Sequence, residues 1–294
     1  MPNINHISIW ACPVCKLPLS KLLSSSAKNT DQQWLCANQH SFDTAKEGYI
    51  NLLLSHQKRS SSPGDTKLMV SSRQDFLAEG HYEPLSKKII SLLDKYLATN
   101  SVLLDSGCGE GYYLRQLLTQ RDDIHIFGID ISKEAAKVIS RQIKNSYFAV
   151  ASSFDLPILT NSVDCLLRIF APGDDAEAAR ILKETGTLVV VSAGPKHLLS
   201  LKKLLYQEAK EHLPHDNLEN FLLLNEKKFS YQIEIKGAEK INQLVAMTPL
   251  YWRTSKLAQA SLNELESLST EVDFIIKIYK PIKNNAWNNA SIKI

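Results

Sequence analysis

The stretch VLLDSGCGEGY, residues 102–112, decides the fold. It begins as a short apolar run, passes through a turn with three glycines, and leads into a segment expected to be helical from about Tyr112. Glycine lets the backbone of such a turn approach a ligand closely, and the helix that follows offers unpaired N–H groups at its N-terminus. The stretch therefore predicts a strand–loop–helix unit whose loop binds a small molecule.

Strands and helices alternate along the chain after this unit. The expected strands are 101–105, 124–130, 147–150, 162–170 and 186–192, with further helices from Ser132 and over about 198–212. This alternation is typical of a doubly wound, Rossmann-like α/β fold with a parallel sheet. Two late β-rich segments, 221–235 and 272–279, are expected to add an antiparallel hairpin at the edge of the sheet.

The glycine loop departs from the dinucleotide-binding pattern G-x-G-x-x-G. Its third glycine, Gly111, comes one residue early, and Tyr112 stands where that pattern requires glycine. Asp105 and Glu110 place negative charge where a pyrophosphate would have to lie. S-adenosylmethionine has no phosphate and carries a positive amine and a positive sulfonium. The acidic loop therefore favours S-adenosylmethionine over NAD.

The ends of the next two strands supply further cofactor groups. Asp130 ends the second strand, and an acidic side chain at this point can accept hydrogen bonds from both ribose hydroxyls. Ser152 and Ser153 follow the third strand, where groups flank an adenine. Together with close backbone approach at Gly107 and Gly109, these positions predict the class I methyltransferase variant of the fold with S-adenosylmethionine as cofactor.

Two pairs of metal-ligand residues lie near the N-terminus. Cys12 and Cys15 are spaced Cys-x2-Cys, and Cys36 and His40 are spaced Cys-x3-His. Each pair fits one tight turn, and four N and S ligands form a closed tetrahedral zinc site. All four positions are filled by protein, which favours a structural over a catalytic zinc. Because so short a module has a small core, metal binding would supply much of its folding free energy. Cysteines buried by chance are the alternative explanation.

Composition and charge limit the class of protein. The 294 residues are 44% hydrophobic and 22% charged, which fits one large globular domain plus a small one. No run approaches the roughly 18 apolar residues of a membrane span, and no signal peptide is recognisable, so we expect a cytoplasmic protein without a membrane partner. Residues 1–60 hold six lysines and arginines against three acids, so the net charge of +3 lies there. This favours an anionic partner such as RNA, although a solvated lysine surface also explains it.

A polar, breaker-rich segment follows the N-terminal module. Residues 57–65 read QKRSSSPGD and predict a linker, with Asp65 expected to cap a helix through Phe76. The expected organisation is a zinc-binding module at 1–55 that recognises RNA, a linker with lead-in helices at 56–100, and the methyltransferase domain at 101–294.

The fourth strand carries the residues nearest the expected reaction. It lacks the D/N-P-P-aromatic motif typical of enzymes that methylate exocyclic amines, and it lacks the Pro-Cys dipeptide of pyrimidine C5 methylation, which needs a thiolate. Arg168 is unusual on a buried strand: it would stabilise negative charge on a substrate carbonyl, or form an ion pair with a nearby acid. Phe170, Tyr251 and Trp252 would stack on a flipped base or pack in the core.

These motifs together resemble the bacterial 23S rRNA (guanine-N1-)-methyltransferases of the RlmA type. The matching stretches are Cys12–Cys15, Cys36–His40, Phe42–Tyr49, Pro63–Asp65, Phe76–Tyr82, Leu104–Tyr113, Ala151–Ser153, Arg168–Pro172, Gly194–His197 and Met247–Arg253. Overall similarity favours the type of Gram-negative bacteria, which acts on guanine 745, over the 748 type. Phe170 and Gln74 depart from the pattern, since tyrosine and a second arginine are usual there.

The resemblance implies methyl transfer to guanine N1 in a 23S rRNA hairpin, with the zinc module helping to bind the RNA. It implies cofactor contacts at Tyr82, Gly109, Glu110 and His197. The expected RNA-binding residues are Lys58, Arg59, Arg73, Phe170 and Trp252. A homodimer is a further expectation.

The expected mechanism centres on the proton of guanine N1. The nitrogen must lose this proton before or during attack, and the resulting negative charge on O6 would be stabilised by Arg168. The general base is not identified; Asp155, Glu83 or water would serve. A small-molecule methyltransferase, and a zinc-containing RNA-binding protein whose methyltransferase fold is inactive, are the alternative functions.

Overall fold

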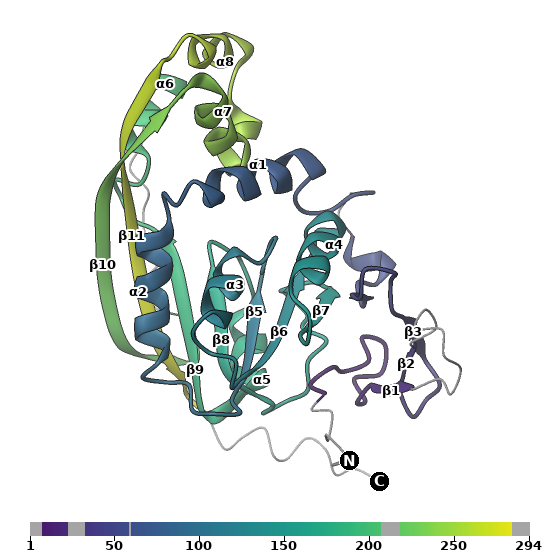
Figure 1. Ribbon diagram of the computed structural model, residues 1–294. Helices are drawn as coiled ribbons and strands as arrows, with labels where there is room; N and C mark the ends of the chain where they lie inside the picture. Colours follow the sequence, from purple (N-terminus) through teal and green to yellow (C-terminus); the bar gives the residue numbers. More distant parts are fainter. Residues whose placement is uncertain (1–7, 23–32, 59, 207–217, 284–294) are drawn as a thin grey trace.

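The computed structural model describes residues 8–22, 33–58, 60–206 and 218–283. Within these residues, eight strands form one sheet in the order β10-β11-β9-β8-β5-β6-β7-β4 (Figure 1). The strands of this sheet are β4 Ile50–Asn51, β5 Val102–Ser106, β6 His125–Asp130, β7 Tyr147–Val150, β8 Val163–Ile169, β9 Leu182–Ala193, β10 Phe221–Lys236 and β11 Ser267–Pro281. The six strands from β4 to β9 are parallel, while β10 and β11 pair antiparallel at one edge. The predicted class I methyltransferase sheet and late hairpin are confirmed.

Helices cover both faces of the sheet. They are α1 Lys67–Ala78, α2 Glu83–Leu93, α3 Tyr112–Leu118, α4 Lys133–Gln142, α5 Asp175–Ile181, α6 Leu199–Leu205, α7 Ala238–Ala246 and α8 Lys256–Asn263, with 3-10 turns η1 Ser55–Gln57 and η2 Pro249–Arg253. Because each face is covered, the central strand β5 is buried along its whole length and reads as an almost continuous apolar run. Of the helix expected over 198–212, residues 207–212 lie outside the described residues.

Two helix starts show how short polar side chains set the ends of these elements. The Ser132 hydroxyl accepts a hydrogen bond from the Ala135 N–H at the start of α4. The expected cap at Asp65 is wrong: the Thr66 hydroxyl accepts the N–H of Met69, and Asp65 instead pairs with Arg73. Both residues are good cap formers, and in the folded chain Thr66 caps the helix while Asp65 pairs with Arg73 of α1.

The N-terminal module has a three-stranded sheet of its own. Its strands are β1 Ser20–Leu22, β2 Gln33–Leu35 and β3 Ser41–Asp43. The module shares a core with the large sheet, because Trp10 is fully buried and its ring meets Phe127 of β6 at a centroid distance of 5.6 Å. The short strand β4 follows the module and pairs in parallel with β7, an extension that the sequence did not predict.

Among the described residues, no helix is long and apolar enough to cross a membrane.

Candidate functional site: a zinc centre and a cofactor loop

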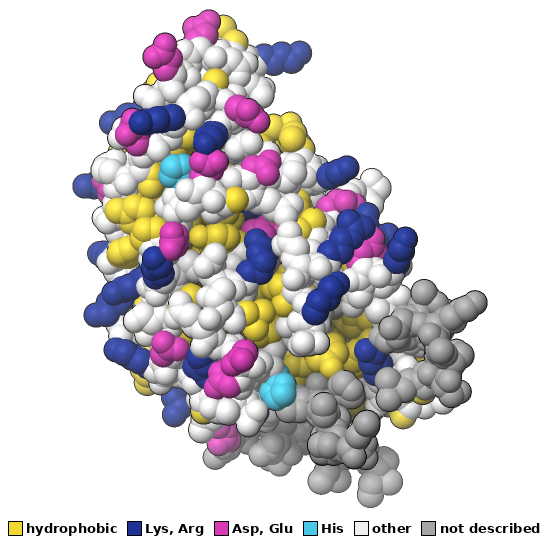
Figure 2. Space-filling view, in the orientation of Figure 1, with side chains coloured by type: hydrophobic (Ala, Val, Ile, Leu, Met, Phe, Trp, Pro, Cys, Tyr) yellow, Lys and Arg dark blue, Asp and Glu magenta, His cyan; other side chains and the backbone are white. Residues whose placement is uncertain are grey.

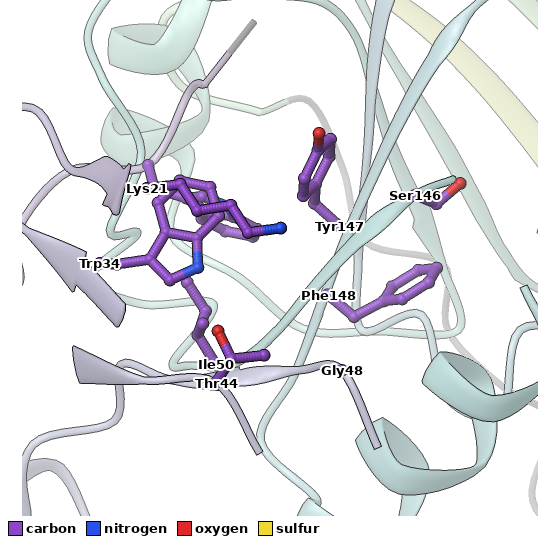
Figure 3. Close-up of a pocket in the computed structure, with 9 residues that line it drawn as sticks. Lys21, Trp34, Thr44, Gly48, Ile50, Ser146, Tyr147 and Phe148 are labelled. Atoms are coloured by element: carbon purple, nitrogen blue, oxygen red, sulfur yellow. The ribbon is translucent and has the colours of Figure 1, made fainter. Parts of the chain in front are cut away.

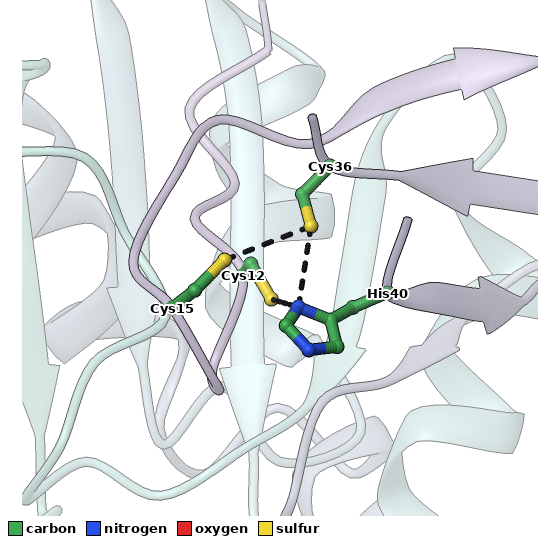
Figure 4. A group of neighbouring side chains, drawn as sticks. All are labelled: Cys12, Cys15, Cys36 and His40. Carbon is green, nitrogen blue, oxygen red and sulfur yellow. Dashed lines mark hydrogen bonds between the residues drawn. The ribbon is translucent and has the colours of Figure 1, made fainter. Parts of the chain in front are cut away.

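The four predicted metal ligands come together in the N-terminal module. The ligand atoms of Cys12, Cys15, Cys36 and His40 all lie within 4.8 Å of one another (Figure 4). His40 Nδ1 is 3.5 Å from Cys12 Sγ and 3.4 Å from Cys36 Sγ, and Cys15 Sγ is 3.6 Å from Cys36 Sγ. A tetrahedral zinc with bonds of about 2.3 Å to sulfur requires ligand separations of roughly 3.8 Å, so the group fits this ion.

Local turns place these ligands. The Lys16 N–H donates to the carbonyl of Cys12, and the Gln39 N–H donates to the carbonyl of Cys36. The first turn closes one residue after the Cys12 and Cys15 pair, and the second closes between Cys36 and His40. Each turn therefore directs its two ligand side chains to the same side. A backbone hydrogen bond from Leu17 lowers the pKa of the Cys15 thiol, which favours the thiolate that binds zinc.

The glycine loop follows β5 and is packed too closely for larger residues. A Cβ atom at Gly107 would lie 2.4 Å from the Cβ of Ala171, and one at Gly111 would lie 2.6 Å from the Ile139 side chain. Both glycines also have φ values that L residues rarely adopt, +85° and +88°. The loop is therefore held against the end of β8 and against α4 at once.

Asp130 fixes this loop from the neighbouring strand. Its Oδ2 accepts the N–H of Gly109 at 2.9 Å, and its Oδ1 accepts the N–H of Ser132 at 2.7 Å. Each carboxylate oxygen can accept a second hydrogen bond, so Asp130 has the capacity to bind the ribose hydroxyls as predicted.

Asp105 is the least satisfied acid of the site. It is 2% exposed, and its Oδ1 has no hydrogen-bond partner among the described residues. Burial, together with the charge of Asp130, raises the pKa of Asp105 to about 8. A buried carboxylate oxygen without a partner is costly unless a cation meets it. The amine of S-adenosylmethionine is such a cation, so the residues present fit this cofactor.

Glu110 has a different environment from the one its predicted role suggests. Its carboxylate is 1% exposed and forms an ion pair with Arg115 at 2.7 Å. The Glu110 carbonyl also accepts from Arg115, at 2.6 Å, so a cofactor contact at Glu110 stays a prediction. At the end of β7, Ser152 is buried and Ser153 is partly exposed. The Ser152 hydroxyl accepts the N–H of Phe154.

An aromatic group lies beside the loop. The Tyr82 hydroxyl is 3.4 Å from Nε2 of His197, and Phe170 stacks on the His197 ring at a centroid distance of 6.2 Å. Phe170 immediately precedes Ala171, the residue packed on Gly107, and its side chain is 44% exposed. The structure thus brings Tyr82, Phe170 and His197 together from three distant parts of the chain.

Arg168 forms an ion pair with a nearby acid, which is one of the two roles that the sequence allowed. Its side chain is buried, its Nη1 donates to Asp175 at 2.9 Å, and its Nη2 donates to the carbonyl of Asp174. A Cβ at Gly173 would lie 2.8 Å from the guanidinium, so the group is enclosed at the start of α5. The structure supports an ion pair with a local acid, and the catalytic role stays a prediction.

The predicted RNA-binding residues differ in their exposure and in their partners. Lys58 is exposed, Trp252 is 65% exposed, and Arg59 lies outside the described residues. Arg73 pairs with Asp65 at 2.5 Å and donates from Nη2 to the carbonyl of Met247. Its Nη1 lies 3.4 Å from the position of a Cβ on Gly109, so Arg73 is directed at the glycine loop and a contact with RNA stays a prediction.

The two candidate general bases are already paired. Asp155 pairs with Lys16 of the N-terminal module and accepts from Gln57 at 2.8 Å. Glu83 pairs with Lys87 at 2.7 Å. Neither carboxylate is assigned as the base. Figure 2 shows lysines and arginines interspersed with acidic side chains over the visible face, so charge does not mark a site there.

Comparisons with known proteins agree with this site. The family model of the RlmA N-terminal zinc ribbon matches residues 10–61, and a methyltransferase domain model matches residues 103–190. The 23S rRNA (guanine(748)-N(1))-methyltransferase of Streptomyces fradiae is 28% identical over 92% of this chain and 97% of the relative. A putative 23S rRNA (guanine-N(1)-)-methyltransferase of Bacillus subtilis is 28% identical over 95% of this chain and 99% of the relative.

The fold and the site define the class of protein. The chain is an S-adenosylmethionine-dependent methyltransferase with an N-terminal zinc ribbon, and its zinc is structural. The resemblance to the RlmA-type rRNA (guanine-N1-)-methyltransferases is confirmed over most of the chain. The preference for the Gram-negative subtype stays a prediction.

Proposed function

We propose that this protein transfers a methyl group to N1 of a guanine in a hairpin loop of 23S ribosomal RNA. The observation that carries the proposal is the combination, in one chain, of an RlmA-type zinc ribbon and a methyltransferase domain. Relatives that match almost end to end bear the name of this activity. A basic ribbon is not required for a small-molecule substrate, and the complete cofactor loop argues against an inactive fold.

The proposed chemistry assigns a role to each part of the site. S-adenosylmethionine supplies the methyl group as an electrophile on a positive sulfur. Asp105 would accept a hydrogen bond from the amine of the cofactor, and Asp130 would accept hydrogen bonds from its ribose. The exposed ring of Phe170, next to the loop, offers a surface on which a flipped guanine can stack.

Positioning is the main catalytic contribution in this proposal. The tightly packed glycine loop would hold the cofactor, and stacking on Phe170 would hold the guanine, so that the two reactants meet in one relative orientation. The proton of N1 leaves to a base that we do not assign. Arg168 remains the candidate for stabilising charge on O6, although Asp175 holds its guanidinium.

We extend the proposal to the organisation of the chain. Residues 1–55 form the RNA-recognition module, 56–100 the linker with its lead-in helices, and 101–294 the methyltransferase domain. The module is not expected to act as a detached unit, because Trp10 and β4 pack on the large sheet. A homodimer and a cytoplasmic location stay predictions.

The test compares ribosomal RNA from a strain that carries the gene with RNA from a deletion strain. Nuclease digestion and mass spectrometry should show one N1-methylguanosine lost from 23S RNA in the deletion strain. Purified protein with S-adenosylmethionine should restore it on 23S RNA from that strain. If both RNA samples carry the same modified nucleotides, the proposal is wrong.

A further inference from the structure

A cavity lies at the seam between the zinc ribbon and the large sheet. It has a volume of about 100 Å³, and residues of both modules line it (Figure 3). Lys21 and Trp34 are register partners on β1 and β2 of the ribbon, while Tyr147 and Phe148 belong to β7 of the sheet. The cavity therefore exists only when the two modules are packed together.

Lys21 is an unusual residue to find in such a place. It is partly buried, and it forms no ion pair or hydrogen bond with any described residue. Burial lowers the pKa of Lys21, and no carboxylate offsets this effect. In Figure 3 its amino group points from the ribbon into the space in front of Tyr147 and Phe148. Partial removal of this cation from water disfavours its charged form, and an anion that meets the amino group would offset that effect.

The rest of the cavity wall is largely aromatic, and its one unpartnered hydroxyl is out of reach of a ligand. The hydroxyl oxygen of Thr44 is buried and makes no hydrogen bond in the described part of the chain. Aromatic rings form much of the remaining wall, with Trp34 and Tyr147 in edge-to-face contact at a centroid distance of 6.2 Å. The cavity thus combines one cation with aromatic surface, a combination that suits a nucleotide.

We infer that this cavity is a binding site for one unpaired nucleotide of the RNA substrate. The phosphate is placed at the amino group of Lys21, and the edge of the base lies against Tyr147. A cavity of this size admits part of a single nucleotide but no duplex, which selects a loop or bulge. The identity of the RNA rests on the proposed function, whereas binding of an unpaired nucleotide does not.

Lys21→Met removes the charge and keeps a side chain of similar length. We expect it to weaken binding of protein-free 23S RNA, and of a short fluorescein-labelled oligouridylate, by about tenfold, as for the loss of one charge-assisted hydrogen bond. The plot of log affinity against log salt concentration should become less steep by roughly 0.7, the value for one phosphate contact on a single strand.

The same variant separates a binding role from a structural one. Because the unpartnered cation is a cost to the free protein, Lys21→Met should leave the thermal unfolding midpoint unchanged or raise it. Affinity for S-adenosylmethionine should stay the same. The matched control is Lys46→Met, which removes the same charge from an exposed position of the same module. It should bind both RNAs within about twofold of the unaltered protein.

Several outcomes would overturn the inference. They are unchanged RNA affinity in Lys21→Met, an equal loss in Lys46→Met, or a lowered unfolding midpoint with lost S-adenosylmethionine affinity. Failure of the proposed function looks different. In that case 23S RNA is not methylated, yet Lys21→Met still weakens binding of the oligouridylate.

Discussion

The ionisation of Asp105 provides a quantitative prediction for the cofactor site. This buried carboxyl has a pKa raised from 3.8 to about 8 by burial and by Asp130. Since the folded protein then holds the proton more tightly than the unfolded chain does, Asp105 makes stability fall as pH rises from about 4 to about 8. Each unit of pKa shift corresponds to about 1.4 kcal/mol. At pH 7 this carboxyl therefore lowers the free energy of unfolding by on the order of 4 kcal/mol relative to its value below pH 4.

Cofactor binding should lower the pKa of Asp105 again. The amine of S-adenosylmethionine favours the ionised carboxylate, so binding at pH 7 should release on the order of 0.9 proton from Asp105. Calorimetry in two buffers with different ionisation enthalpies counts that proton. Affinity should rise about tenfold between pH 6 and pH 7 and then level off above pH 8, where most of the carboxyl is ionised and the amine loses its own proton.

Asp105→Asn tests the same reasoning by mutation. The amide cannot ionise, so the cofactor-free variant should be more stable than the unaltered protein at pH 8, by a few kcal/mol, and its stability should lose the pH dependence of this window. It should also lose affinity for S-adenosylmethionine. Asp122→Asn, at an exposed carboxylate, is the matched control. A variant with normal affinity and proton release, or with lower stability at pH 8, would refute the argument.

Three further predictions follow from the geometry. Cys36→Ser should lose the zinc, as measured by metal analysis. It should also lower the thermal unfolding midpoint of the whole chain, because the ribbon shares a core with the large sheet. Full zinc content in this variant would show that the ligand set is wrong. Arg168→Met should lower the free energy of unfolding in denaturant by about 3 kcal/mol, because it leaves the Asp175 carboxylate unpaired. Adding Asp175→Leu to this variant should recover much of that loss. Normal stability with lost turnover in Arg168→Lys would instead restore the catalytic assignment. Asp130→Ala should weaken S-adenosylmethionine binding by about 1–3 kcal/mol in calorimetry, and unchanged affinity would remove Asp130 from the site.

The parts of the site that lie close together in sequence were predictable. The glycine loop, Asp130 and the Cys-x2-Cys pair are read from short stretches, because each follows from the end of one strand or from one tight turn. The alternation of strands and helices predicted the parallel sheet for the same reason, since a βαβ unit is a local pattern. The identity of the helix cap was harder to predict, because Asp65 and Thr66 are both suitable, and only the structure shows that Thr66 caps the helix while Asp65 pairs with Arg73.

Other features depend on contacts between distant segments, which short-range patterns do not encode. Arg168 had two plausible roles until the fold placed Asp175 beside it, and the unsatisfied oxygen of Asp105 appears only when the strands close over it. The seam cavity joins Lys21 to Tyr147 across more than a hundred residues, and no local signal marks either one. The sequence by itself therefore determined the fold class, the zinc ligands and the cofactor loop. The tertiary structure decided which charged groups are paired and which are left free to meet a ligand, because burial and pairing are properties of the packed chain.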